Sequence, residues 1–260
     1  LRAKLALVAV VPIAVMLALG FHGAWLKYAE LQKREQAQSL SSLVVDLGEV
    51  VHELQKERGM SAGFINSNGS KFADNLGTQR KLSDEQASRL QQSISRIDAS
   101  FVGPRYIKLL ETAGEPLAKL GEKREQISRL ALTPAESFSF YSDLIVHLLE
   151  VAVRTGNQMP SSKLSRLLNS KQALLYLKER NGQERALLTG AFSAGGLTTA
   201  RFNRFLGLLG DQSTFQRIAI SYATPKQETL LLDKLSDPAA KEIATIEQMV
   251  KYKGANTELG

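Results

Sequence analysis

Apolar side chains recur between residues 37 and 65 at alternating steps of three and four residues, and this spacing constrains the fold most. It places them on one stripe of an α-helix, in the core phase of a coiled coil, for about four heptads. A second stripe of the same kind follows the first turn, so the chain should fold around long packed helices. The first stripe holds Ala37, Leu40, Val44, Leu47, Val51, Leu54, Arg58, Ser61 and Ile65; the second holds Ala73, Leu76, Arg80, Ser83, Ala87, Leu90, Ile94, Ile97 and Phe101.

Turn and capping residues divide the rest of the chain into further helices. Asn66–Ser70 ends the first stripe, and Gly103-Pro104 ends the second. One helix is expected from Pro104 to about Leu130, and a capping box at Thr133–Glu136 starts the next. Short connections predict an all-α fold of two antiparallel four-helix bundles after an N-terminal transmembrane helix. The expected bounds are 28–159 for the first bundle and 160–260 for the second.

The first 27 residues predict a transmembrane anchor. Arg2 and Lys4 precede an uncharged apolar run, Leu5–Leu26, and about 20 such residues span a bilayer. The basic flank places the N-terminus in the cytoplasm, so the remainder is expected to be periplasmic, on the inner membrane. A cleaved signal peptide, with Ala18–Gly20 as its small-residue site, is the alternative.

Composition excludes several kinds of chemistry. Cysteine is absent, and the three histidines are far apart without ligand spacing, so neither a metal nor another cofactor is expected. No nucleophile–base pair or phosphate loop indicates an enzyme. The net charge is +7, but the basic residues alternate with acidic ones as on a solvated helix surface. A nucleic-acid partner is therefore not expected.

Arg58 and Arg80 occupy positions where the two stripes should be buried. Around a turn centred near Asn68, an antiparallel hairpin would place them about 3 Å apart in height. Two buried like charges need a partner. One interpretation is a carboxylate of the protein: Glu57 and Asp84 are near but out of phase, whereas Glu179 or Glu184 could reach in. A drifting stripe that leaves Arg58 at the bundle edge is another, and a bound planar oxyanion is the third.

The segment around Arg58 has a weak internal echo. "QKERGMSAGF" (Gln55–Phe64) is mirrored by "GQERALLTGAF" (Gly182–Phe192), which makes Arg185 the counterpart of Arg58. Two bundles that each present an arginine could share one ligand at their interface.

These segments, with "QRKLSD" (Gln79–Asp84) and the stretch from Glu184 to Phe215, resemble the NIT domain, the nitrate- and nitrite-sensing domain of bacteria. The resemblance covers about Leu43 to Val250. It implies two four-helix bundles that hold the anion between them by arginines. With the predicted anchor, it suggests a methyl-accepting chemotaxis protein as the parent. Arg58 and Arg185 match the arginine-bearing motifs of the family, but Gly59 follows Arg58 and no arginine occurs after Arg217, so another anion is also open.

The sequence thus predicts a ligand-sensing region of a transmembrane receptor that binds nitrate or nitrite between two bundles. Arg58, Arg185 and Arg80 are the predicted anion ligands, with Gln55, Ser61 and Glu184 in support. A homodimer is expected. The alternative function is a helical dimerisation or protein-interaction module without a small ligand.

Overall fold

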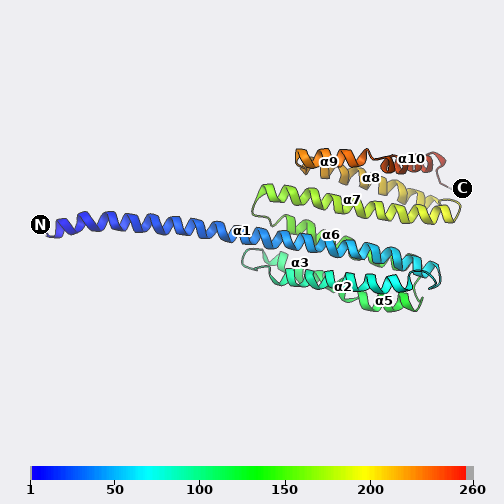
Figure 1. The fold of residues 1–260 in the computed structure, drawn as a ribbon, viewed down its shortest axis with the longest axis horizontal. Helices are drawn as coiled ribbons and strands as arrows, with labels where there is room; N and C mark the ends of the chain where they lie inside the picture. Colours follow the sequence, from blue (N-terminus) through cyan, green and yellow to red (C-terminus); the bar gives the residue numbers. More distant parts are fainter. Residues whose placement is uncertain (1, 256–260) are drawn as a thin grey trace.

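One helix, α1 (Arg2–Asn66), organises the computed structural model, in which residues 2–255 are described, with side chains at 10 and 12–255. The first half of α1 projects from the rest of the molecule, and the second half lies between the other helices (Figure 1). It packs mainly against α2 and α6, and it also contacts α7. The predicted stripe is buried from Ala37 to Ser61. Leu43, Val50 and Glu57 are buried as well, so α1 is covered on more than one side.

The first group of helices surrounds the second half of α1. It consists of α2 (Ala73–Ser95), α3 (Pro104–Ala113), α4 (Glu115–Ala118), α5 (Leu120–Ser128) and α6 (Pro134–Gly156). Its core extends from Leu40 on α1 to Ala152 on α6. The capping box at Thr133 and Glu136 starts α6 as predicted.

The single helix predicted from Pro104 to Leu130 is wrong, because this segment forms α3, α4 and α5. The breaks fall at Gly114 and Lys119. Pro116 has no N–H to donate to a preceding turn, so it is accommodated in the first turn of the short α4 instead.

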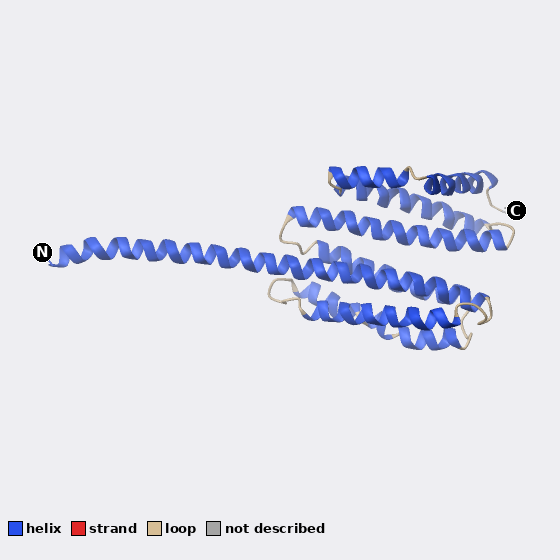
Figure 2. Ribbon diagram, viewed as in Figure 1, coloured by secondary structure: helices blue, strands red, loops and turns tan. Residues whose placement is uncertain are grey.

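The second group contains α7 (Ser162–Ser193), α8 (Thr199–Tyr222), α9 (Pro225–Leu235) and α10 (Pro238–Lys253). Helices α7 and α8 pack closely, and α9 and α10 follow one another along α8 (Figure 1). The core is small, with Ala191, Leu197, Phe205 and Val250 buried. Residues 157–161 connect the two groups; that each group is a separate domain remains a prediction. Within residues 2–255 every regular element is a helix, which confirms the all-α class (Figure 2).

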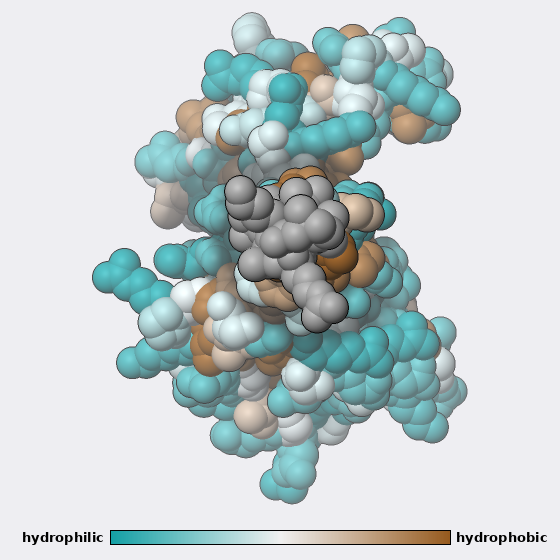
Figure 3. Space-filling view, turned by 90° about the vertical axis from the view of Figure 1, so that its left-hand side faces the viewer, coloured by the Kyte–Doolittle hydropathy of each residue, from teal (hydrophilic) through white to brown (hydrophobic). Residues whose placement is uncertain are grey.

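The predicted membrane location is not supported. In the part of the chain that the structure describes, no helix is long and apolar enough to cross a membrane. The side chains of residues 1–9 and 11, among them Arg2 and Lys4, lie outside the described residues. The anchor at residues 1–27 is therefore unconfirmed, and the prediction of an inner-membrane protein with a periplasmic sensor region is wrong for the described chain. Seen from the end at which α1 projects, both helix groups present mostly hydrophilic side chains (Figure 3).

Candidate functional site

Arg58 is buried where α1, α6 and α7 meet. Its side chain is only 4% exposed, and its two terminal nitrogens bond the two oxygens of Glu179 on α7, at 2.6 and 3.2 Å. Nη1 also donates to Ser142 Oγ of α6 at 2.8 Å. The guanidinium carbon lies 4.6 Å from the centre of the Phe138 ring, within the range of a cation–π contact. The interpretation that a carboxylate of the protein neutralises Arg58 is thus confirmed.

The Glu179 carboxylate collects donors from both sides of this contact. Gln55 Nε2 on α1 donates to Oε2 at 2.9 Å, and Gln183 Nε2 on α7 donates to Oε1 at 2.7 Å. The amide oxygen of Gln183 in turn accepts from Arg204 Nη2 of α8 at 2.7 Å. We call Gln55, Arg58, Glu179 and Gln183 the Glu179 cluster. It links the first helix group to the second.

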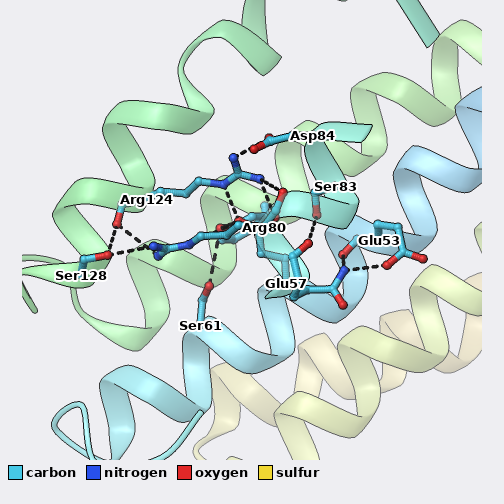
Figure 4. Close-up of polar contacts among 10 residues, drawn as sticks. Glu53, Glu57, Ser61, Arg80, Ser83, Asp84, Arg124 and Ser128 are labelled. Atoms are coloured by element: carbon cyan, nitrogen blue, oxygen red, sulfur yellow. Dashed lines mark hydrogen bonds and ion pairs between the residues drawn. The ribbon is translucent and has the colours of Figure 1, made fainter. Parts of the chain in front are cut away.

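A second buried carboxylate, Glu57, lies inside the first group (Figure 4). It is fully buried, and Arg124 of α5 binds both its oxygens, Nε to Oε1 at 2.7 Å and Nη2 to Oε2 at 2.9 Å. The Tyr141 hydroxyl donates to Oε1 at 2.8 Å. Arg80 Nε is 3.9 Å from the same oxygen, while its terminal nitrogens bond Ser128 Oγ and the carbonyl of Arg124. We call Glu57, Arg80, Arg124 and Tyr141 the Glu57 cluster.

Burial, hydrogen bonds and neighbouring charges shift the pKa values of residues in the Glu57 cluster. Burial opposes ionisation of Glu57, but hydrogen bonds from Arg124 and Ser83 hold the pKa of its carboxyl below the usual value. Burial lowers the pKa of Arg80 and, with the nearby Glu57 charge, raises that of Tyr141. Glu57 is therefore ionised and Tyr141 neutral at neutral pH.

The structure does not bring the three predicted anion ligands together. Arg58 bonds to α6 and α7, whereas Arg80 bonds to α5, so the expected pair at one level is not formed. Arg185 is exposed, because its neighbour Glu184 takes the buried position on α7. Arg185 thus differs from Arg58 in burial, and its role as an anion ligand stays a prediction.

The supporting residues are divided among three places. Gln55 belongs to the Glu179 cluster. Ser61 is buried with its hydroxyl 3.5 Å from that of Tyr141, at the Glu57 cluster. Glu184 is in the second group, where Gln212 Nε2 donates to its Oε2 at 2.6 Å and its Oε1 is buried without a partner.

Sequence reasoning missed Glu57 as a buried residue and Arg124 as its main partner. Glu57 is out of phase with the stripe, yet α1 is covered on several sides, so residues beside the stripe are buried too. Arg124 lies in "EKREQ", a segment that looks like a solvated helix surface. Only the need to neutralise a buried Glu57 could have indicated such a partner.

Comparison with known proteins identifies the family. The family model described as nitrate and nitrite sensing, NIT, matches residues 49–259. The chain therefore belongs to the nitrate- and nitrite-sensing family, and the predicted resemblance is confirmed.

Two relatives extend this result. The nitrate regulatory protein of Klebsiella oxytoca is 23% identical over 215 residues, which cover 81% of this chain and 54% of the relative. The structure of the NasR transcription antiterminator matches with a TM-score of 0.75 at 20% identity, over 90% of this chain and 64% of that one. The chain thus spans about half to two thirds of the proteins it matches, and the structural match shows a shared fold. Neither relative supports the predicted chemotaxis receptor.

Proposed function

We propose that this protein senses nitrate or nitrite by binding the anion at Arg58, between the two helix groups. The observation that carries the proposal is the buried guanidinium itself, which is aimed at a planar carboxylate across the contact of α1 with α7. A guanidinium fork suits any planar oxyanion of similar size. Membership of the nitrate- and nitrite-sensing family supports these anions as the ligands.

The position of Arg58 supports a role in signalling. An anion at this place contacts residues of both helix groups, because Gln55 and Arg58 are on α1 and Gln183 is on α7. A ligand that binds one relative position of the groups better than another shifts the population toward that position. The anion is bound and released unchanged.

The test is thermal unfolding and calorimetry with nitrate and nitrite. At a concentration of about one hundred times the dissociation constant, the ligand should stabilise the protein by about 2.7 kcal/mol. Arg58→Lys keeps a charge beside Glu179 but loses the planar fork, so it should weaken binding at least about tenfold. Arg185→Lys is the matched control on the exposed counterpart and should bind as the parent does. Equal binding by both variants would refute the role of Arg58.

A second candidate function is a helical dimerisation or protein-interaction module without a small ligand. The Arg58–Glu179 pair favours it, because the pair neutralises the buried charge without any anion. The same titration separates the two functions, since the module shows neither binding heat nor stabilisation with either anion.

A further inference from the structure

The Glu179 carboxylate accepts hydrogen bonds from the same N–H groups that an anion bound at Arg58 would use. Its Oε1 accepts from Arg58 Nη1 at 2.6 Å and Gln183 Nε2 at 2.7 Å. Its Oε2 accepts from Gln55 Nε2 at 2.9 Å and Arg58 Nη2 at 3.2 Å. Two oxygens thus receive four N–H groups from three side chains, and Glu179 itself is fully buried.

We infer that Glu179 is a built-in competitor for the anion site, and that nitrate or nitrite binds by replacing its carboxylate at Arg58. This inference rests on the proposed function. Carboxylate, nitrate and nitrite are all planar oxyanions of charge −1, so the exchange leaves the guanidinium paired with one negative charge. Both anions cannot remain, because two like charges beside one buried guanidinium repel each other strongly.

The space around the guanidinium also favours exchange over addition. A Cβ placed on Gly182 of α7 would lie only 3.1 Å from Arg58 Nη2, so the α7 backbone is close to this nitrogen. On the other side, Phe138 lies against the guanidinium and Ser142 accepts from Nη1. The face of the fork that remains is the one occupied by Glu179.

The exchange affects how the two helix groups are joined. Among the ion pairs of the described residues, Arg58–Glu179 is the one that connects α1 with α7; the pair of Arg180 and Asp211 lies within the second group. Replacing Glu179 by a free anion removes this covalently anchored charge from the contact and leaves α7 held to α1 only by the remaining contacts, such as Lys178 with His52 and Leu175 beside Gly48. The competition also weakens the apparent affinity, because only the fraction of molecules with Glu179 displaced can bind.

The test is titration of the full chain and of Glu179→Gln with sodium nitrate and sodium nitrite, by calorimetry and thermal unfolding. Removing the competitor should raise the affinity at least about tenfold. Glu179→Asp keeps the charge but shortens its reach, so it should give a smaller rise in affinity. This variant replaces Glu179→Gln in the test if Glu179→Gln does not fold. Glu53→Gln is the matched control, because Glu53 is a buried carboxylate of α1 that bonds Gln79 and Lys56 rather than Arg58. It should bind as the parent does.

The outcomes separate this inference from the proposed function. If the parent binds and both Glu179 variants bind equally or more weakly, the exchange is wrong and the anion site stands. A rise that Glu53→Gln reproduces also overturns the exchange, since it then reflects the general loss of negative charge. Binding by Glu179→Gln alone shows that the carboxylate blocks the site without being displaced, which overturns both the exchange and the sensing proposed for the parent chain. No binding by any variant refutes the proposed function and the exchange with it.

Discussion

The same Glu-Arg pair occurs in two helices and is used differently in each. On α1, Glu57 and Arg58 are both buried, and each has a partner of opposite charge. On α7, Glu184 is buried with a single amide donor from Gln212, and Arg185 is exposed. The sequence around the two pairs is similar, so the difference comes from what surrounds the helices.

The surroundings explain the difference through helix geometry. Consecutive residues on an α-helix point about 100° apart, so both can be buried only where the helix is covered on two sides. At this point, α1 has α5 and α6 on the side of Glu57 and α6 and α7 on the side of Arg58. At Glu184, α7 is covered by α8 and α10, whereas the next residue, Arg185, points to water. A repeated motif thus predicts a repeated role only where the coverage of the helix is repeated.

The largest expected effect is at Glu57. Glu57→Gln removes the charge that neutralises Arg124 and lies near Arg80, and it should lower the free energy of unfolding by about 3–5 kcal/mol. Asp84→Asn is the control, because Asp84 also pairs with Arg124 but is 60% exposed; it should cost less than about 1 kcal/mol. Urea denaturation measures both. Similar losses in the two variants would show that burial does not distinguish the two carboxylates.

The next contrast is between Gly63 and Gly190, which lie six residues after Glu57 and Glu184 respectively. A Cβ at Gly63 would lie 2.5 Å from the Phe72 ring, whereas one at Gly190 meets nothing within 4 Å. Gly63→Ala should therefore destabilise by about 1–3 kcal/mol. Gly190→Ala should stabilise by about 0.5–1 kcal/mol, because alanine is the better helix former. Melting temperatures that move in the same direction for both would contradict this contrast.

Replacing Glu184 by glutamine should raise the free energy of unfolding, whereas the same change at Glu57 should lower it. Burial raises the pKa of Glu184 above the ordinary value of 4.5, and burial also raises that of Glu247, with the Glu184 charge adding to it. A raised folded-state pKa means that stability is fully present below about pH 4.5 and is lost as the carboxyl ionises at higher pH. Glu184→Gln should therefore stabilise the protein at pH 7 by about 1 kcal/mol.

The gain at Glu184 should disappear at pH 4, where the parent carboxyl is protonated as well. Glu242→Gln is the control on the exposed surface of α10, and as a surface substitution it should change the free energy of unfolding by no more than about 0.5 kcal/mol. Melting curves at both pH values measure this, and a gain that is equal at pH 4 and pH 7 would exclude ionisation of Glu184 as its cause.

The smallest effect belongs to Arg185. Arg185→Ala removes an exposed side chain, so the free energy of unfolding should change by no more than about 0.5 kcal/mol. Denaturant unfolding of this variant provides the baseline for the substitutions at Glu57. A decrease in the free energy of unfolding of more than about 1 kcal/mol would contradict this prediction, because it would mean that the Arg185 side chain makes a stabilising contact.

The sequence predicted the parts of the structure that depend on local periodicity and capping. The buried stripe from Ala37 to Ser61 and the start of α6 at Thr133 follow from such local rules. The breaks at Gly114 and Lys119 flank Pro116, which is a signal for a helix end that the prediction of one helix does not use. The pairing of Arg124 with Glu57, 67 residues away, could not be predicted, because periodicity does not show which surfaces meet.

For Arg58 too, the sequence predicted burial but not the partner. Its burial followed from phase, and a carboxylate partner was one of three interpretations that phase left open. Choosing among them required the position of α7 relative to α1, which brings Glu179 rather than Glu184 to the guanidinium. The sequence near Arg58 shows that a charge is buried there, but the partner, Glu179, comes from a distant helix and cannot be read from that segment.

The unbroken length of α1 has a mechanical consequence. At 1.5 Å per residue, the part before Ala37 extends about 50 Å beyond the first buried residue. For a rigid helix of this length, a tilt of about 5° at Ala37 displaces the far end by about 4–5 Å. The helix that carries Arg58 at one end is therefore a lever arm, which enlarges small movements at the bundle into displacements of several ångströms at its tip.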